Sequence, residues 1–304
     1  LNVHLQPISD AASMIRPANL RGLSADSTLI TTNGKRRHHA SVIAFQGGGV
    51  NDGSQGADIS VIPAIALKRV EVLRDGASAQ YGSDAIAGVI NFVLDDISEG
   101  GSLSYKMGEY TEGDGATTTI AGKYGMPLGQ DGFVTTSFQI RQADDTSRSA
   151  QRPDAAALIA AGNNAVANPA QIWGAPKIDD DVTFFMNSGV TNSDGSESYM
   201  FGNYSERDVD GGFYYRNPDG RDGVFTNPVD GANKRLVGNI DGTCQYGTGT
   251  SQAIDPSDYA TRDLIMADPS CFLMNQVAPG GYTPRFLGNI TDSSLTIGRR
   301  GDIS

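Results

Sequence analysis

The segment Val70 to Leu94, VEVLRDGASAQYGSDAIAGVINFVL, determines the fold predicted for this chain. It has the pattern of a short strand, a turn region and a second strand that ends in the apolar run VINFVL. Gly76, Gly82 and Gly88 recur every six residues, as expected where the backbone needs a positive φ or passes close to another segment. No Ser/His or Cys/His arrangement, metal-ligand spacing or phosphate loop accompanies the segment, so it indicates a structural motif.

Two further stretches extend this pattern in order along the chain. They are LRGLSADSTLITTNGKRR, from Leu20 to Arg37, and IPAIALKRVEVLRDG, from Ile62 to Gly76. The series resembles the end of the plug domain of TonB-dependent outer-membrane receptors and covers about the first third of the chain. The resemblance implies an N-terminal α+β plug over residues 1–97 inside an antiparallel transmembrane β-barrel of about 22 strands, begun by residues 98–304.

Composition agrees with an all-β-dominated protein. The chain has 38 Gly, and many Asn, Asp, Ser and Thr residues separate short alternating segments. No apolar run reaches 18 residues, so no transmembrane helix is predicted. A barrel strand needs only about 10 residues and places its lipid-facing side chains at every second position, so hydropathy does not exclude a membrane protein.

The net charge of −12 is distributed unevenly. Residues 1–97 hold 8 Lys and Arg against 9 Asp and Glu, whereas residues 98–304 hold 15 against 26. We interpret the acidic part as long exposed loops; the alternative is an electrostatic bias against anionic ligands. Nucleic acid is not expected as a partner, because its binding requires a basic face.

A period of two residues becomes regular from Gly101. Strands are predicted near 102–110, 118–126, 134–141, 182–189, 198–207 and 294–300. One face is predicted to turn away from the plug toward lipid, with Leu103, Tyr105, Met107, Ile120, Tyr124, Phe138 and Ile140 on it. Lys106, Lys123 and Arg141 are predicted to point inward. A soluble sandwich would show the same alternation, and the plug-like segment upstream favours the barrel.

The predicted connections alternate in length. Long ones near 111–116, 143–181 and 208–293 alternate with short turns at 127–132 and 191–197, as in barrels with long extracellular loops. Because about 22 strands need roughly 220 residues, we expect the remaining strands beyond Ser304. A signal peptide and the TonB box are expected before Leu1.

The resemblance identifies a set of structural plug positions. The charged members are expected to pair with one another or with the barrel wall, and direct ligand contact is the alternative. Tyr81, Gly82 and Asn91 are expected to define a turn and a strand. The set comprises Arg21, Gly22, Arg69, Glu71, Arg74, Gly76, Tyr81, Gly82, Gly88 and Asn91.

A basic run follows the turn signal Asn33-Gly34 and spans Lys35 to His39. We favour a solvated loop; the alternatives are a charged contact with the barrel wall and a ligand contact, for which His38 is the candidate. His38 and His39 would point to opposite faces of a strand, so they are not expected to chelate one metal. Residues 47–58 are predicted to form a flexible loop without a phosphate site.

Acidic and aromatic residues mark the predicted outer loops. The carboxylates at 179–181 and from Asp208 are interpreted as exposed loop tips, and Ca²⁺ binding is the alternative. Trp173, Tyr214 and Tyr215 are candidates for stacking on a ligand or for packing the loop. Neither a metal nor a cofactor is expected.

Cys244 and Cys271 are the only cysteines, and both fall in the long predicted outer loop. A disulfide between them is predicted, because such bonds persist outside the reducing cytosol. The alternatives are free thiols or partners beyond this sequence.

The resemblance implies a receptor in the outer membrane of a Gram-negative bacterium, which binds a scarce solute outside the cell and imports it with energy relayed by TonB. Its partners would be TonB, membrane lipid and a solute such as a siderophore, vitamin, saccharide or peptide. The alternative is a surface binding or structural barrel protein without active import. No enzyme is predicted, and the scattered carboxylates disfavour a secreted hydrolase.

Overall fold

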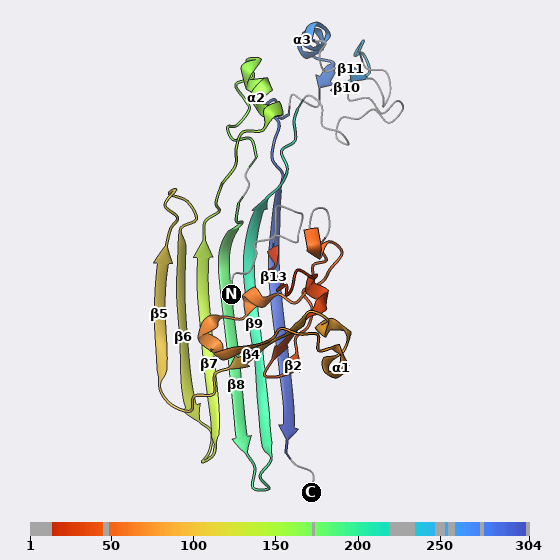
Figure 1. Cartoon of the computed structure of the whole chain (residues 1–304). Helices are drawn as coiled ribbons and strands as arrows, with labels where there is room; N and C mark the ends of the chain where they lie inside the picture. The colour runs from red at the N-terminus through yellow and green to blue at the C-terminus, as the bar shows by residue number, and fades with distance from the viewer. Residues whose placement is uncertain are drawn as a thin grey trace. The chain divides into compact units, whose positions relative to one another are not determined.

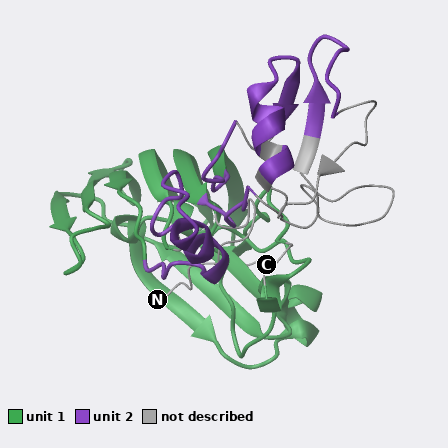
Figure 2. Ribbon diagram, turned by 90° about the horizontal axis from the view of Figure 1, so that it is seen from above, with its two compact units in different colours: residues 1–147, 174–211, 285–304 green, residues 148–173, 212–284 purple. Residues whose placement is uncertain are grey.

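The computed structural model describes residues 14–44, 49–171, 174–218, 235–246, 253–254, 259–273 and 277–301 (Figure 1). The chain divides into two compact units (Figure 2). The first comprises Leu1–Ser147, Gly174–Gly211 and Arg285–Ser304, and the second comprises Arg148–Trp173 and Gly212–Pro284. None of the described helices is long and apolar enough to cross a membrane.

A four-stranded sheet, here called the small sheet, contains the segment that determines the fold. Its strands are β1 (Thr28–Thr32), β2 (Lys35–Arg36), β3 (Leu67–Leu73) and β4 (Gly88–Leu94), in the order β2-β1-β4-β3. Strands β1 and β4 run parallel, whereas β3 pairs antiparallel with β4. The short helix α1 (Ser78–Tyr81) lies in the connection from β3 to β4.

Two local features explain how this sheet forms. Asn33 and Gly34 have φ angles of 48° and 75°, which matches the left-handed turn that joins β1 to β2 as a tight hairpin. Gly88 has a φ of 140°, and a Cβ there would collide with the Leu73 carbonyl oxygen on the neighbouring strand. Only glycine fits at this position, where β4 begins.

A six-stranded sheet, here called the large sheet, follows in the same unit. In the order β13-β9-β8-β7-β6-β5, strands β5 to β9 lie side by side as they follow one another in sequence and pair antiparallel, and β13 lies beside β9. All six strands expected from the alternating pattern are confirmed. Their bounds are β5 (Gly101–Gly108), β6 (Thr117–Pro127), β7 (Gly132–Ala143), β8 (Lys177–Thr191), β9 (Glu197–Gly212) and β13 (Arg285–Arg300).

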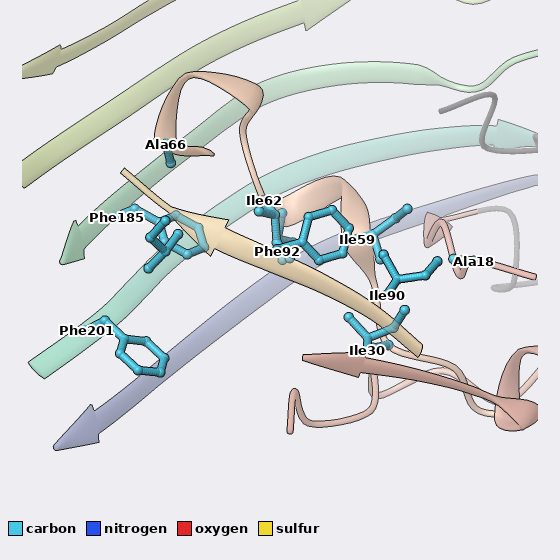
Figure 3. Close-up of a cluster of buried hydrophobic side chains, with 12 residues drawn as sticks. Ala18, Ile30, Ile59, Ile62, Ala66, Ile90, Phe92, Phe185 and Phe201 are labelled. Carbon is cyan, nitrogen blue, oxygen red and sulfur yellow. The ribbon is translucent and has the colours of Figure 1, made fainter. Parts of the chain in front are cut away.

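The small sheet packs on one face of the large sheet, across β8, β9 and β13 (Figure 1). We call this the inner face. Phe185 of β8 and Phe201 of β9 point from it into a buried cluster with residues of the small sheet and its connections (Figure 3). The cluster comprises Ala18, Ile30, Ala57, Ile59, Val61, Ile62, Ala66, Ile90, Phe92, Leu94, Phe185 and Phe201.

The predicted facing of the large sheet is confirmed. Leu103 and Met107 are 75% and 74% exposed on the opposite, outer face, and Tyr105, Ile120, Tyr124, Phe138 and Ile140 are exposed as well. Lys123 reaches Asp95 on the inner side. Register places Lys106 on that same face, because Lys106 opposes Thr119 and Ser102 opposes Lys123.

Two predicted loops, 143–181 and 208–293, are shorter than expected. Residues 179–181 lie inside β8, where Asp181 is buried and Asp180 has a φ of 50° at an irregularity in the pairing. Residues 208–212 complete β9, and β13 begins as early as Arg285. The strands extend past the apolar band because backbone pairing does not require apolar side chains, so the interpretation as exposed loop tips is wrong for Asp181.

The second unit contains two small cores. One includes helix α2 (Pro153–Ala160), with Ala155 packed beside Val166, Ala170 and Tyr215. The other joins β10 (Arg235–Asn239), β11 (Ala253–Ile254), β12 (Cys271–Leu273) and α3 (Tyr259–Ala267). The predicted disulfide between Cys244 and Cys271 is confirmed in this second core.

Candidate functional site

The contact between the small sheet and the inner face of the large sheet contains buried charges from both sides. Arg37 follows β2 and is 5% exposed. Its guanidinium pairs with Asp292 of β13 and donates hydrogen bonds to Asn203 Oδ1 at 2.7 Å and Ser294 Oγ at 2.8 Å. Burial lowers the pKa of Arg37, and the Asp292 carboxylate opposes this shift. Arg37 is thereby held against two adjacent strands.

A second buried pair has the opposite polarity. Arg207 of β9 is 3% exposed, and its guanidinium pairs with Asp58 and donates to the Met14 carbonyl oxygen at 2.8 Å. Asp58 also accepts from the backbone N–H groups of Arg16 at 3.1 Å and Ser60 at 3.0 Å. Asp58 therefore ties its own segment together while it binds the large sheet.

A third group of contacts holds the segment that follows β4. Lys123 of β6 pairs with Asp95. Asn187 of β8 donates to the Asp95 carbonyl oxygen at 3.0 Å, and Thr135 of β7 donates to the Ile97 carbonyl oxygen at 2.8 Å. The link between the two sheets is thus bound to three neighbouring strands.

One of these three ion pairs has the opposite polarity to the other two. The N-terminal part supplies the cation Arg37 and the anions Asp58 and Asp95, while the large sheet supplies Asp292, Arg207 and Lys123. Each buried charge is matched by one from the other partner, so a shift of either sheet would separate all three pairs. Breaking one partner of a buried pair is costly, although a formed pair adds little stability.

The predicted structural positions lie in the small sheet and its connections, and their role as a latch stays a prediction. Arg69 Nε lies 2.7 Å from Glu71 Oε1, and Asn91 donates to Glu71 Oε2 at 2.8 Å. These hydrogen bonds, the one from Asn91 above all, lower the pKa of Glu71. Arg21 and Arg74 are exposed.

The glycines of this set differ in their backbone. Gly22, Gly82 and Gly88 have φ angles of 70°, 93° and 140°, and Arg21 before Gly22 has a φ of 57°. Gly76 is not among the glycines with a positive φ, but a Cβ on it would lie 3.2 Å from the Ile86 carbonyl oxygen. Tyr81 ends α1, directly before Gly82.

The basic run is not the solvated loop that we favoured. Lys35 and Arg36 form β2, and Arg37 is buried against the large sheet, which is the wall contact named as an alternative. His38 lies beside it, with Nε2 2.7 Å from Asp292 Oδ2. The segment expected as a flexible loop is described from Gly49 onward, and it ends at the buried Asp58.

The aromatic candidates Tyr214 and Tyr215 in the second unit differ in how deeply they are buried. Tyr215 is 2% exposed, and its hydroxyl donates to the Gly280 carbonyl oxygen at 2.6 Å, so its ring packs the loop and cannot stack on a ligand. Tyr214 is half-buried and makes an edge contact with Phe213. Trp173 lies outside the described residues.

Asp58, Asp95, Arg207 and Asp292 were not identified from the sequence as site residues. A charged residue at an inner-facing strand position is the only local signal for Arg207 and Asp292, and their partners lie 149 and 255 residues away. Within the described residues, no group of three or more His, Cys, Asp or Glu side chains is placed to hold a metal ion.

Comparisons with known proteins bear on the N-terminal part of the chain and on its fold. Residues 3–89 match the family model described as the TonB-dependent Receptor Plug Domain. A mutant of the ferric enterobactin receptor PfeA of Pseudomonas aeruginosa is 18% identical with a TM-score of 0.50, over 64% of this chain and 27% of that chain. At this identity the likeness shows a shared fold.

Two other solved structures have TM-scores just below that value. PfeA in complex with enterobactin is 20% identical with a TM-score of 0.49, over 64% of this chain and 27% of that chain. The siderophore receptor PirA of Acinetobacter baumannii is 16% identical with a TM-score of 0.49, over 73% of this chain and 30% of that chain. This chain thus spans about a quarter to a third of the length of these receptors. Residues 3–89 thus match the plug domain model of TonB-dependent receptors, and the chain shares its fold with part of one such receptor.

Proposed function

We propose that this chain belongs to an outer-membrane transporter that binds a scarce solute outside the cell and imports it with energy relayed by TonB. The observation that carries the proposal is the packing of the plug domain on the inner face of the large sheet through three ion pairs, one of which has the opposite polarity to the other two. A domain held by separable polar contacts, rather than by an apolar interface alone, is suited to being displaced and reseated.

The large sheet supports placement in a membrane. Its outer face presents exposed apolar side chains on successive strands, including Leu103, Phe138, Phe184 and Leu295, as a lipid-facing wall requires. The division into a plug over residues 1–97 and a barrel from residue 98 is part of the proposal. The transport cycle would involve no covalent chemistry.

The solute is a small molecule that diffusion through general pores supplies too slowly. Siderophores, vitamins, saccharides and peptides all meet this description, and the PfeA and PirA structures are of siderophore receptors. The second unit, with its disulfide-linked core, would form part of the outer surface that captures the solute.

Uptake measurements test the proposal. Cells that express the full-length receptor would receive labelled ferric enterobactin, cyanocobalamin, a maltooligosaccharide or a short peptide, with and without TonB. We expect one solute to accumulate only when both receptor and TonB are present. Binding of a solute without TonB-dependent accumulation would instead support the alternative of a surface protein without active import.

A further inference from the structure

A cavity of about 410 Å³ lies between the small sheet and the large sheet, apart from the three ion pairs. It sits where the large sheet has short turns, because Phe133 and Glu197 lie at the starts of β7 and β9 and Arg300 ends β13. Its volume falls in the range of about 300–1,000 Å³ that is typical of small-molecule sites.

The charges around this cavity are almost fully compensated. Arg69 pairs with Glu71 at 2.7 Å, and Arg300 pairs with Glu197 at 2.7 Å. The lining carboxylate of Asp96 pairs with Lys68 at 2.7 Å. Lys35 is different, since no ion pair within the described part of the chain involves it. One positive charge therefore remains without a carboxylate partner in the lining.

An aromatic surface adjoins this charge. Lys35 Nζ lies 5.8 Å from the ring centroid of Tyr199, and the Arg300 guanidinium carbon lies 5.7 Å from the same centroid. Phe201 stacks beside Tyr199 at 6.2 Å between centroids, and Phe133 also lines the cavity. Figure 3 shows Phe201 at the margin of the buried cluster. The cavity thus combines the Lys35 cation with aromatic and aliphatic walls.

The amide groups of the lining are already engaged. Asn33 donates to Asn187 Oδ1 at 3.2 Å, Asn187 donates to the Asp95 carbonyl oxygen at 3.0 Å, and Asn91 donates to Glu71 at 2.8 Å. A saccharide, which needs many hydrogen-bond partners, would find few of them here. A compact anion with an apolar body needs only the charge of Lys35, which has no carboxylate partner among the described residues.

We propose that this cavity is a binding site for a small organic anion. A carboxylate or phenolate of the ligand pairs with Lys35, and an aromatic or apolar body lies against Tyr199 and Phe133. All residues that line the site belong to the first unit. Its occupancy does not depend on active import, so the proposed transport function and this site can fail separately.

Binding of 4-bromobenzoate to the full-length receptor in detergent tests the site, with the neutral amide 4-bromobenzamide as the matched ligand. Titration calorimetry should show saturable binding of the anion and at least tenfold weaker binding of the amide. Lys35→Gln should weaken anion binding about tenfold. Lys106→Gln removes an inner-face lysine of β5 outside the cavity lining and should leave binding unchanged.

The position of the bromine atom in a crystal structure shows where 4-bromobenzoate binds. Crystals of the unaltered receptor soaked in 4-bromobenzoate should give an anomalous bromine peak between β1–β2 and β8–β9, beside Tyr199. Equal affinity for the acid and the amide, equal affinity of the two lysine variants, or a peak only elsewhere would overturn the proposal. Since this measurement uses the unaltered chain, misfolding of a variant would not obscure the answer.

Discussion

Arg207 and Asp58 meet with only 3% of each side chain exposed, which makes this pair the most deeply buried of the three ion pairs on the large sheet. Both charges were removed from water on folding, and their mutual attraction and extra hydrogen bonds only offset that loss. If one partner were replaced, the charge of the other would stay buried without a counter-ion. The cost of breaking the pair therefore exceeds the stability that the intact pair adds.

We expect Asp58→Asn to destabilise the plug domain by about 3–5 kcal/mol, because it leaves the Arg207 charge buried without its anion. The double variant Asp58→Asn with Arg207→Met should recover part of this loss. Hydrogen exchange of the amides in β1 and β4 reports the free energy of local opening.

Arg69→Gln is the control, since the Arg69–Glu71 pair is exposed on both sides. Its removal should leave exchange nearly unchanged, as is usual for surface pairs. If Asp58→Asn and Arg69→Gln had the same effect, burial would not be what makes the Arg207–Asp58 contact matter.

Gly88 provides a second residue-scale prediction. Gly88→Ala should cost roughly 1–3 kcal/mol, because the residue has a φ of 140° and a Cβ would meet the Leu73 carbonyl oxygen. Gly108→Ala in β5 is the matched control, since nothing lies within 4 Å of a Cβ there. Thermal unfolding of the two variants compares them, and equal melting temperatures would contradict the prediction.

At the scale of elements, β5 presents neighbouring residues to opposite environments. Leu103 lies on the outer face, whereas Ser104 lies on the inner face with Lys106. Leu103→Arg should destabilise the folded sheet in lipid by about 2–4 kcal/mol if the position is near mid-membrane, and Ser104→Arg should cost far less. Denaturant titration in lipid vesicles measures both, and the opposite ranking would reverse the assignment of the faces.

The disulfide acts on a different element, the small core of β10, β12 and α3 in the second unit. The bond joins residues 27 apart, and in the chain-entropy model closing such a loop stabilises by about 3–4 kcal/mol. Replacing Cys244 and Cys271 together by Ser should speed hydrogen exchange in β10 and β12. Exchange in β6 and β7 should stay constant, and faster exchange there would show that the loss of stability is not local.

At the scale of the whole molecule, import as proposed requires the plug domain to move away from the inner face of the large sheet. Met14 and Gly288 offer a way to prevent this, because a Cβ on Gly288 would lie 2.5 Å from Met14 Sδ. The double variant Met14→Cys with Gly288→Cys should form a disulfide across the interface. TonB-dependent accumulation of the solute should then stop and return on addition of a reductant.

A second engineered disulfide, within the large sheet, controls for effects of crosslinking that do not involve the plug domain. The hydroxyl oxygens of Thr183 in β8 and Ser205 in β9 lie 3.0 Å apart, so Thr183→Cys with Ser205→Cys should link two strands without binding the plug. Full import by the oxidised Met14–Gly288 variant would show that the plug does not need to move away from β13.

The sequence by itself determined the strands of the large sheet, the turn at Asn33-Gly34 and the disulfide. Each of these follows from a short-range or compositional rule: a period of two residues set by two unlike faces, a dipeptide that adopts positive φ, and a pair of cysteines in a loop predicted to lie outside the reducing cytosol. These rules act within a few residues or on residue type alone. They therefore remained valid without knowledge of the packing.

Only the tertiary structure decided which charges meet. Arg37 and Asp292 are 255 residues apart, and Arg207 and Asp58 are 149 apart. Their pairing depends on strand register and on where the small sheet packs against the large sheet. A slip of one residue in the register of β9 would turn Arg207 to the outer face. Asp181, which had been interpreted as part of an exposed loop tip, is also buried. Local patterns specify which face a residue takes, whereas contact between two faces is a property of the folded whole.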